Sequence, residues 1–268
     1  MVKIIFLGSA GSSNVLARGG YSAGGLVLQF DGVQFHMDPG PGALFSALQA
    51  GINPKQTTVF LASTSDLIKT HDLSLLIDTM TYSGIERRGL LVAASSVVNG
   101  NDESDASLRL LQRDRLDKLV VLKPGNKVGI SLCEVHPVRV DSNDNDALGY
   151  KLFFPKFLLG YIGKTLLTKE LLEDLEGCDM LIFDLPSNVR EDENMKSLSL
   201  EDAKQLLLSV KPKMAILNGF DLGALKYDPI IMCRELSEAT GVQCIASKKG
   251  LMLNSNALLS HSPVRGFK

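Results

Sequence analysis

The chain has 268 residues, of which 45% are hydrophobic and 22% charged, so it can bury a large core in a single domain. Its 28 basic and 30 acidic residues are mixed along the sequence, and a formal net charge of −2 gives no clear nucleic-acid signal. The sequence contains no uninterrupted apolar run of the roughly 18 residues that a membrane span needs, and it lacks the pattern of a secretion signal.

The cysteines also indicate a protein of the cytoplasm. Cys133, Cys178, Cys233 and Cys244 are widely spaced and form no Cys-x-x-Cys pair. Such spacing is typical of reduced thiols in the core and argues against a zinc knuckle or a disulfide framework. We therefore expect a cytoplasmic protein with no membrane attachment.

Taken in chain order, the hydrophobic pattern first predicts short strands and then an alternation of strands and helices. Strands are predicted at 4–7, 25–30, 34–37 and 58–62, with a helix at 43–50. Further strands are predicted at 90–93, 119–122, 127–135, 149–154, 158–162, 180–183, 214–217 and 242–246. Helices are predicted at 73–82, 106–115, 168–175, 200–210 and 229–240, where apolar residues recur every three or four positions. The polar stretches 97–107 and 141–147 are expected to be loops. The pattern indicates a mixed α/β protein with enough strands for two sheets.

Several segments carry a resemblance to a known family. The turn at 7–12, the run Asp38-Pro39-Gly40-Pro41-Gly42 after a predicted strand, and the helix at 76–81 are the clearest of them. Together they resemble the metallo-β-lactamase superfamily, in particular a group of archaeal-type metal-dependent hydrolases. The resemblance implies an αββα sandwich of two mixed β-sheets flanked by helices. It covers residues 1–254 as one domain and leaves 255–268 as a C-terminal tail.

The first metal-binding motif of that family is absent. In the family, histidines and carboxylates hold one or two metal ions that convert a bound water into the nucleophile. The resemblance places Thr64 and Asp66 at the first two histidines, Ile68 at the motif aspartate and Lys69 at the third histidine. Only Ser63, which precedes the first histidine position, matches.

The later motifs have lost their ligands in the same way. Ser142 stands at another histidine position, and Lys164, within Gly-Tyr-Ile-Gly-Lys-Thr, stands at the aspartate that bridges the metals. Gly219 stands at the last histidine and Lys249 at an acidic position. Since the ammonium groups of Lys69 and Lys164 would repel a divalent cation, we expect no metal and no other cofactor.

Three functional hypotheses stay open at this point. In our main interpretation the chain is a catalytically degenerate member of the fold, a non-enzymatic binding or scaffold protein whose partner is an anionic small molecule or a protein. The second is a metal-dependent hydrolase with zinc or another divalent metal relocated to Asp66, His71 and Asp72. The third is a metal-free enzyme that uses Lys69 and Lys164.

The former metal site is the part of the chain where these hypotheses differ. We expect Lys69, Lys164 and Lys249 to converge there with Asp38 and Asp66. Packed lysines repel one another, so they need counter-anions. Either the aspartates supply them, in a salt-bridge cluster that replaces the metals, or the lysines bind an anionic ligand.

Overall fold

Two β-sheets face each other in the structure, a computed structural model that describes residues 1–102, 104–190 and 194–256. In these residues each sheet has seven strands. The first contains, in spatial order, β14 (Met252–Asn254), β1 (Lys3–Phe6), β2 (Leu26–Phe30), β3 (Val33–Met37), β4 (Val59–Ala62), β5 (Leu90–Ala93) and β6 (Lys118–Val121). The second contains β13 (Gln243–Ala246), β12 (Met214–Asn218), β11 (Met180–Asp184), β10 (Phe157–Ile162), β9 (Leu148–Phe154), β8 (Cys133–Arg139) and β7 (Val128–Ile130).

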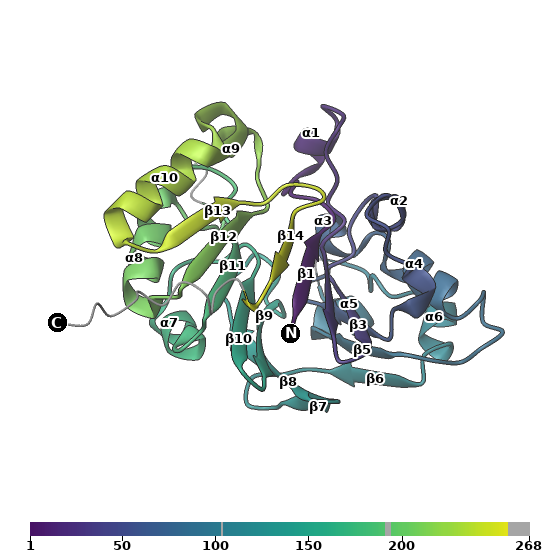
Figure 1. The fold of residues 1–268 in the computed structure, drawn as a ribbon. Helices are drawn as coiled ribbons and strands as arrows, with labels where there is room; N and C mark the ends of the chain where they lie inside the picture. Colours follow the sequence, from purple (N-terminus) through teal and green to yellow (C-terminus); the bar gives the residue numbers. More distant parts are fainter. Residues whose placement is uncertain (103, 191–193, 257–268) are drawn as a thin grey trace.

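Helices cover the outer faces of both sheets. Figure 1 shows α2, α4 and α6 beside the first sheet and α7, α8 and α10 beside the second. In chain order the helices are α1 (Ser13–Leu16), α2 (Ala43–Gln49), the 3-10 helix η1 (Pro54–Gln56), α3 (Leu67–Thr70), α4 (Leu73–Met80), α5 (Ser95–Asn99), α6 (Leu110–Asp114), α7 (Lys169–Leu175), α8 (Leu200–Val210), α9 (Leu222–Tyr227) and α10 (Pro229–Thr240). The arrangement is the expected αββα sandwich.

The main core lies between the two sheets. Phe6, Phe35 and Phe60 from the first sheet and Tyr150 and Tyr161 from the second are fully buried in one apolar cluster. Burial of rings of this size contributes much of the stability of a domain, because each removes a large apolar area from water.

The strand directions bring several chain segments to one edge of the sandwich. β3 to β6 run parallel in the first sheet, and β10 to β13 run parallel in the second. Loops that follow the carboxyl ends of parallel strands meet at the same edge of a sheet, which is where α/β proteins commonly place their ligand sites.

The structure differs from the sequence-based expectation in a few elements. The single strand predicted at 127–135 is an antiparallel hairpin of β7 and β8, because the chain turns at Ser131 with φ +52°. The loop predicted at 97–107 begins inside α5, and the helix predicted at 106–115 is limited to α6.

The first residue of the predicted tail is part of the fold. Ser255 is buried and exchanges two hydrogen bonds with Val2: its amide donates to the Val2 carbonyl oxygen at 2.9 Å, and its Oγ accepts from the Val2 amide at 3.0 Å. Residues 257–268 of the tail lie outside the described part of the chain.

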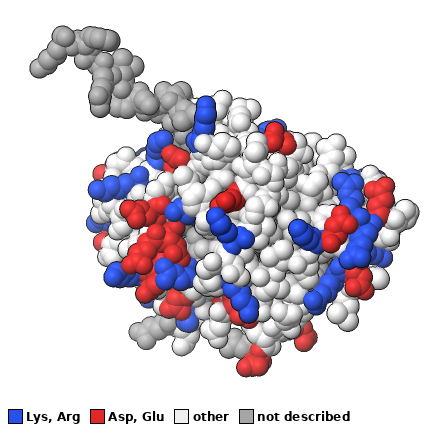
Figure 2. Space-filling view, turned by 90° about the horizontal axis from the view of Figure 1, so that it is seen from below, with Lys and Arg blue, Asp and Glu red and all other residues white. Residues whose placement is uncertain are grey.

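The surface carries both signs of charge. On the face shown in Figure 2, acidic and basic side chains lie in the same areas, as their near-equal numbers lead one to expect. Among the described helices, none has the length and apolar character that crossing a bilayer requires.

Candidate functional site at the strand ends

Asp38 lies at the end of β3 and is fully buried. Its carboxylate accepts hydrogen bonds from the Ser63 amide at 2.8 Å, the Ser63 hydroxyl at 2.6 Å and the Tyr161 hydroxyl at 2.6 Å. These donors come from both sheets, since Ser63 follows β4 and Tyr161 is in β10. Asp38 therefore links the two sheets at their shared edge.

Lys69 fills the centre of this edge. It is in α3, and only 10% of its side chain is exposed. Its Nζ lies 2.7 Å from Asp184 Oδ2 and 3.9 Å from Asp38 Oδ2, and it donates to the Tyr161 hydroxyl oxygen at 3.0 Å. A buried ammonium group between two buried carboxylates is the central feature of the site.

Asp184 is held from the other side by polar groups of β12 and the turn after β13. The Asn218 side-chain amide donates to Asp184 Oδ1 at 3.1 Å, and the Ser247 hydroxyl donates to Asn218 Oδ1 at 2.7 Å. We call the connected side chains of Asp38, Ser63, Lys69, Tyr161, Asp184, Asn218 and Ser247 the Lys69 network.

Burial and charge act against each other in the Lys69 network. Burial alone would lower the pKa of Lys69, but Asp184, Tyr161 and Asp38 raise it well above its usual value. Burial raises the pKa of Asp38, although Lys69 and hydrogen bonds from Ser63 and Tyr161 oppose this shift. Burial and the charge of Asp38 raise the pKa of Tyr161 well above its usual range. Lys69 is therefore a fixed cation near neutral pH, and Tyr161 is a neutral hydrogen-bond donor.

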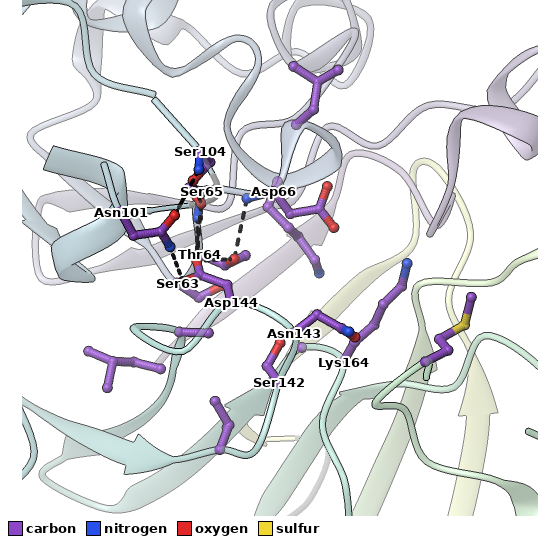
Figure 3. Close-up of a pocket in the computed structure, with 17 residues that line it drawn as sticks. Ser63, Thr64, Ser65, Asp66, Asn101, Ser104, Ser142, Asn143, Asp144 and Lys164 are labelled. Atoms are coloured by element: carbon purple, nitrogen blue, oxygen red, sulfur yellow. Dashed lines mark hydrogen bonds between the residues drawn. The ribbon is translucent and has the colours of Figure 1, made fainter. Parts of the chain in front are cut away.

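A pocket of about 510 Å³ opens beside the Lys69 network (Figure 3). The segment after β4 and α3 form one side of it, with residues 63–67 and Lys69, and the loops after β8 and β10 form the other, with Ser142, Asn143, Asp144, Gly163 and Lys164. The sandwich thus places a polar pocket between its two sheets at the strand ends.

Asp144 organises one wall of this pocket. It accepts hydrogen bonds from the hydroxyls of Ser96 at 2.6 Å, Thr64 at 2.7 Å and Ser65 at 3.2 Å, and from the Ser65 amide at 2.9 Å. Partial burial raises its pKa, but these bonds outweigh that effect and hold the pKa of Asp144 below its usual range. The stretch 141–147, expected to be a solvated loop, therefore ties the two sheets together through a half-buried carboxylate.

The positions identified from the sequence are distributed around this pocket. Thr64, Asp66, Lys69, Ser142 and Lys164 line it. Ile68 instead packs in a small apolar cluster with Ala10, Val15 and Ala23.

Of the five residues expected to converge, Lys69 Nζ lies 3.9 Å from Asp38 Oδ2, and Lys69, Lys164 and Asp66 line the same pocket. Lys249 is exposed in the turn after β13, and Asp66 begins α3 by accepting from the Ile68 amide at 3.0 Å. No ion pair connects Lys164 or Lys249 to Asp38, Asp66 or Asp184 within the described residues.

Asp184 was not identified from the sequence, although a signal was present. The run Met180-Leu181-Ile182-Phe183 predicts a buried strand, and the carboxylate that directly follows this run resembles Asp38, which directly follows β3. Tyr161 lies within a motif that was recognised, but its hydrogen bond to Asp38 depends on how the two sheets pack.

The position of Gly219 leaves no room for a metal-binding side chain. Gly219 has φ +59°, and a Cβ atom there would lie 2.3 Å from Asp184 Cγ and 2.4 Å from Asp184 Oδ1. Any larger residue would collide with a member of the Lys69 network and would also adopt a backbone conformation that L-residues disfavour. A histidine at this position is incompatible with Asp184 where it stands.

The side chains at the site do not suit a metal ion. Zinc requires thiolate, imidazole or carboxylate ligands, usually at least three of them from the protein. Within residues 1–102, 104–190 and 194–256, no group of three His, Cys, Asp or Glu side chains could hold a metal. His71 Nδ1 is hydrogen-bonded to Asp72 Oδ1 at 2.9 Å, and Asp66 caps α3 as described. The ammonium of Lys69 also repels a cation from the centre of the edge.

Comparison with known proteins gives the fold. No family model matches the sequence. The chain is 26% identical over 253 residues to uncharacterized protein MJ1374 of Methanocaldococcus jannaschii, which covers 93% of this chain and 94% of that protein. The structure of this chain is similar to that of the metallo-β-lactamase fold protein YhfI of Bacillus subtilis, with a TM-score of 0.77 and 10% identity. The match covers 94% of this chain and 98% of YhfI.

Zinc-bound PqqB of Methylobacterium extorquens is also similar, with a TM-score of 0.70, 12% identity and coverage of 94% of this chain and 99% of that chain. Likeness at these identities shows the fold alone. The αββα arrangement expected from the sequence is confirmed, and this chain combines it with a site that lacks a set of metal ligands among its described residues.

Proposed function

We propose that this chain, which has the metallo-β-lactamase fold, is a non-catalytic binding protein in which the Lys69 network replaces the metal centre. The observation that carries the proposal is the position of Lys69 Nζ, 2.7 Å from Asp184 and 3.9 Å from Asp38. A protonated amine has no lone pair to coordinate a metal, and it pairs with the carboxylates that a metal would need.

The hypothesis of a relocated metal has less support. Asp66, His71 and Asp72 are the candidate ligands, but Asp66 engages a carboxylate oxygen with the Ile68 amide and His71 pairs with Asp72. No third side chain joins His71 and Asp72 in the described structure to complete a set of three. Without a metal, nothing at this edge generates a hydroxide near neutral pH.

The hypothesis of a lysine-based enzyme is also weaker for Lys69. A lysine acts as a nucleophile or a base only when it is unprotonated, which usually requires a lowered pKa. Its neighbours shift the pKa of Lys69 in the opposite direction. Lys164 lines the pocket, and we propose that it binds a ligand.

The cysteines bear on the cellular compartment. The four cysteines are all free in the structure, and three of them are buried. We propose a cytoplasmic protein, because free thiols persist in the reducing conditions found there.

Elemental analysis of protein purified without chelator tests the proposal. We expect zinc, iron and manganese well below one ion per chain, and a melting temperature that does not change when EDTA is added. One tightly held ion per chain would overturn the proposal.

Assays with phosphodiester, ester and lactam substrates test whether the protein lacks hydrolytic activity. We expect no turnover above the buffer control. Turnover that survives repurification and is abolished by Asp66→Ala or His71→Ala would instead support the relocated-metal enzyme.

A further inference from the structure

The hydroxyl groups on one wall of the pocket have already used their hydrogens. Ser63 Oγ donates to Asp38 at 2.6 Å, Thr64 Oγ1 donates to Asp144 at 2.7 Å, and Ser65 Oγ donates to Asp144 at 3.2 Å. A hydroxyl has one hydrogen and two lone pairs. The oxygens of these three hydroxyls can therefore accept hydrogen bonds from a ligand, but the hydroxyls have no hydrogen left to donate to it.

The opposite side of the pocket has the complementary character. Ser142 and Lys164 are partly buried, and neither has a hydrogen-bond or ion-pair partner among the described residues. Figure 3 shows Lys164 extending from the loop after β10 on the side opposite Thr64 and Asp66. A partly desolvated ammonium without a counter-ion is a favourable place for one anionic group of a ligand.

The charge around the pocket favours an anion with a single negative charge over one with two. Asp144 is held ionised by its hydrogen bonds, and Asp66 adds a second carboxylate at the exposed rim. Lys69 adds no net positive charge, because Asp38 and Asp184 neutralise it. A phosphate with two negative charges would be repelled by these carboxylates more strongly than a carboxylate with one.

We propose that the pocket binds a hydroxyl-rich monocarboxylate of the sugar-acid class. The carboxylate pairs with Lys164 and accepts from Ser142, while ligand hydroxyls donate to the oxygens of Thr64, Ser65 and Asp66. A volume of about 510 Å³ is within the range of small-ligand sites. This inference rests on the proposed function, in which the pocket binds a ligand without converting it.

Calorimetric titration of EDTA-treated protein with three matched probes tests the inference. Glucuronate has one carboxylate, glucose has none, and glucose 6-phosphate has a phosphate in its place. Since a hydrogen bond to a charged group contributes roughly tenfold or more to an affinity, we expect glucuronate to bind at least about tenfold more tightly than glucose. We expect glucose 6-phosphate to bind no more tightly than glucose.

Substitutions at Lys164 assign the effect to the pocket. Lys164→Met is expected to reduce glucuronate binding to the level of glucose, and Lys164→Arg is expected to restore most of it. Lys169→Met is the matched control, because the side chain of Lys169 is 85% exposed on α7 and does not line the pocket. Its affinity for glucuronate should equal that of the unmodified protein.

The outcomes separate this inference from the proposed function. Failure of glucuronate, galacturonate and gluconate to bind, or tighter binding of glucose 6-phosphate, would overturn the sugar-acid assignment and leave the non-catalytic proposal standing. Proton NMR of the mixture over a day would detect conversion of a bound probe. Such conversion would overturn the non-catalytic proposal, while the assignment to the sugar-acid class would still be supported.

Discussion

Replacement of Lys69 by methionine tests the energetic role of the buried cation most directly. Methionine keeps the length and apolar stem of the side chain and removes only the charge and its hydrogen bonds. The variant leaves Asp38 and Asp184 buried without their counter-ion. We expect it to fold with markedly lower stability.

The size of the effect follows from the distances. At an effective dielectric of about 20, separations of 2.7 Å and 3.9 Å give attractions of about 6 and about 4 kcal/mol. Desolvation of the three charged groups offsets much of this sum, at several kcal/mol for each ion. Removing one partner of a buried pair typically costs about 3 to 5 kcal/mol, because the remaining charge is left uncompensated. We therefore expect Lys69→Met to lower the free energy of unfolding by about 4 kcal/mol and the melting temperature by roughly 10 °C.

Urea denaturation, monitored by circular dichroism, measures the loss of unfolding free energy. The pH dependence of this loss shows whether the unpaired carboxyl groups cause it. Burial already raises the pKa of Asp38, and in the variant the charge of Lys69 no longer opposes that shift, so the pKa of Asp38 lies further above its unfolded value. A carboxyl group of this kind supports stability below its unfolded pKa and loses that contribution as pH rises through its folded pKa. The deficit of the variant should therefore be larger at pH 8 than at pH 5.

Two comparisons make the prediction decisive. Lys169→Met removes an exposed lysine and should change stability by no more than about 0.5 kcal/mol. Adding Asp38→Asn and Asp184→Asn to Lys69→Met should recover part of the loss, since no buried charge then remains. A deficit below about 1 kcal/mol, with no difference between pH 5 and pH 8, would refute the role assigned to Lys69.

Two further predictions concern Gly219 and His36. Gly219→Ala should lower the free energy of unfolding by more than the roughly 1 to 2 kcal/mol expected for the left-handed conformation alone, because its Cβ would meet Asp184. Gly177→Ala, at φ +79° with open space around it, should show only the conformational cost. Equal losses of stability for the two variants in urea denaturation would contradict the collision. Burial lowers the pKa of His36 from 6.5 to about 4, so the unfolded chain binds the proton first and stability should fall by about 3 kcal/mol as pH decreases across that interval. His36→Gln should flatten this part of the pH profile of unfolding, and an unchanged profile would show that His36 is not responsible.

The fold and part of the site could be predicted from the sequence. The Asp-Pro-Gly-Pro-Gly run after β3 and the helix at 76–81 fix the positions of Asp38 and Lys69 in a known frame. The spacing of apolar residues predicts which segments form strands and helices. The bounds of α8 and α10 agree with the predicted ranges 200–210 and 229–240. These features are local, so neighbouring residues determine them.

The partners of those residues could not be predicted in the same way. Whether Lys69 meets Asp184 or Lys164 meets Asp66 depends on how two sheets far apart in sequence pack together. The sequence contains both pairs without distinguishing them. In the structure the first pair is 2.7 Å apart, and the second forms no ion pair within the described residues. Hydroxyl orientation on the pocket wall is even less accessible, because it depends on which buried carboxylate lies nearest.

The close approach of Gly219 to Asp184 also bears on how this protein can change over evolutionary time. A substitution to histidine at position 219 collides with Asp184, and loss of Lys69 leaves two carboxylates unpaired. Each first step toward a metal-binding sequence therefore lowers stability before any compensating ligand exists. Marginally stable proteins seldom tolerate such steps one at a time. Descendants of this chain should accordingly vary in the pocket while position 219 stays glycine and position 69 stays basic.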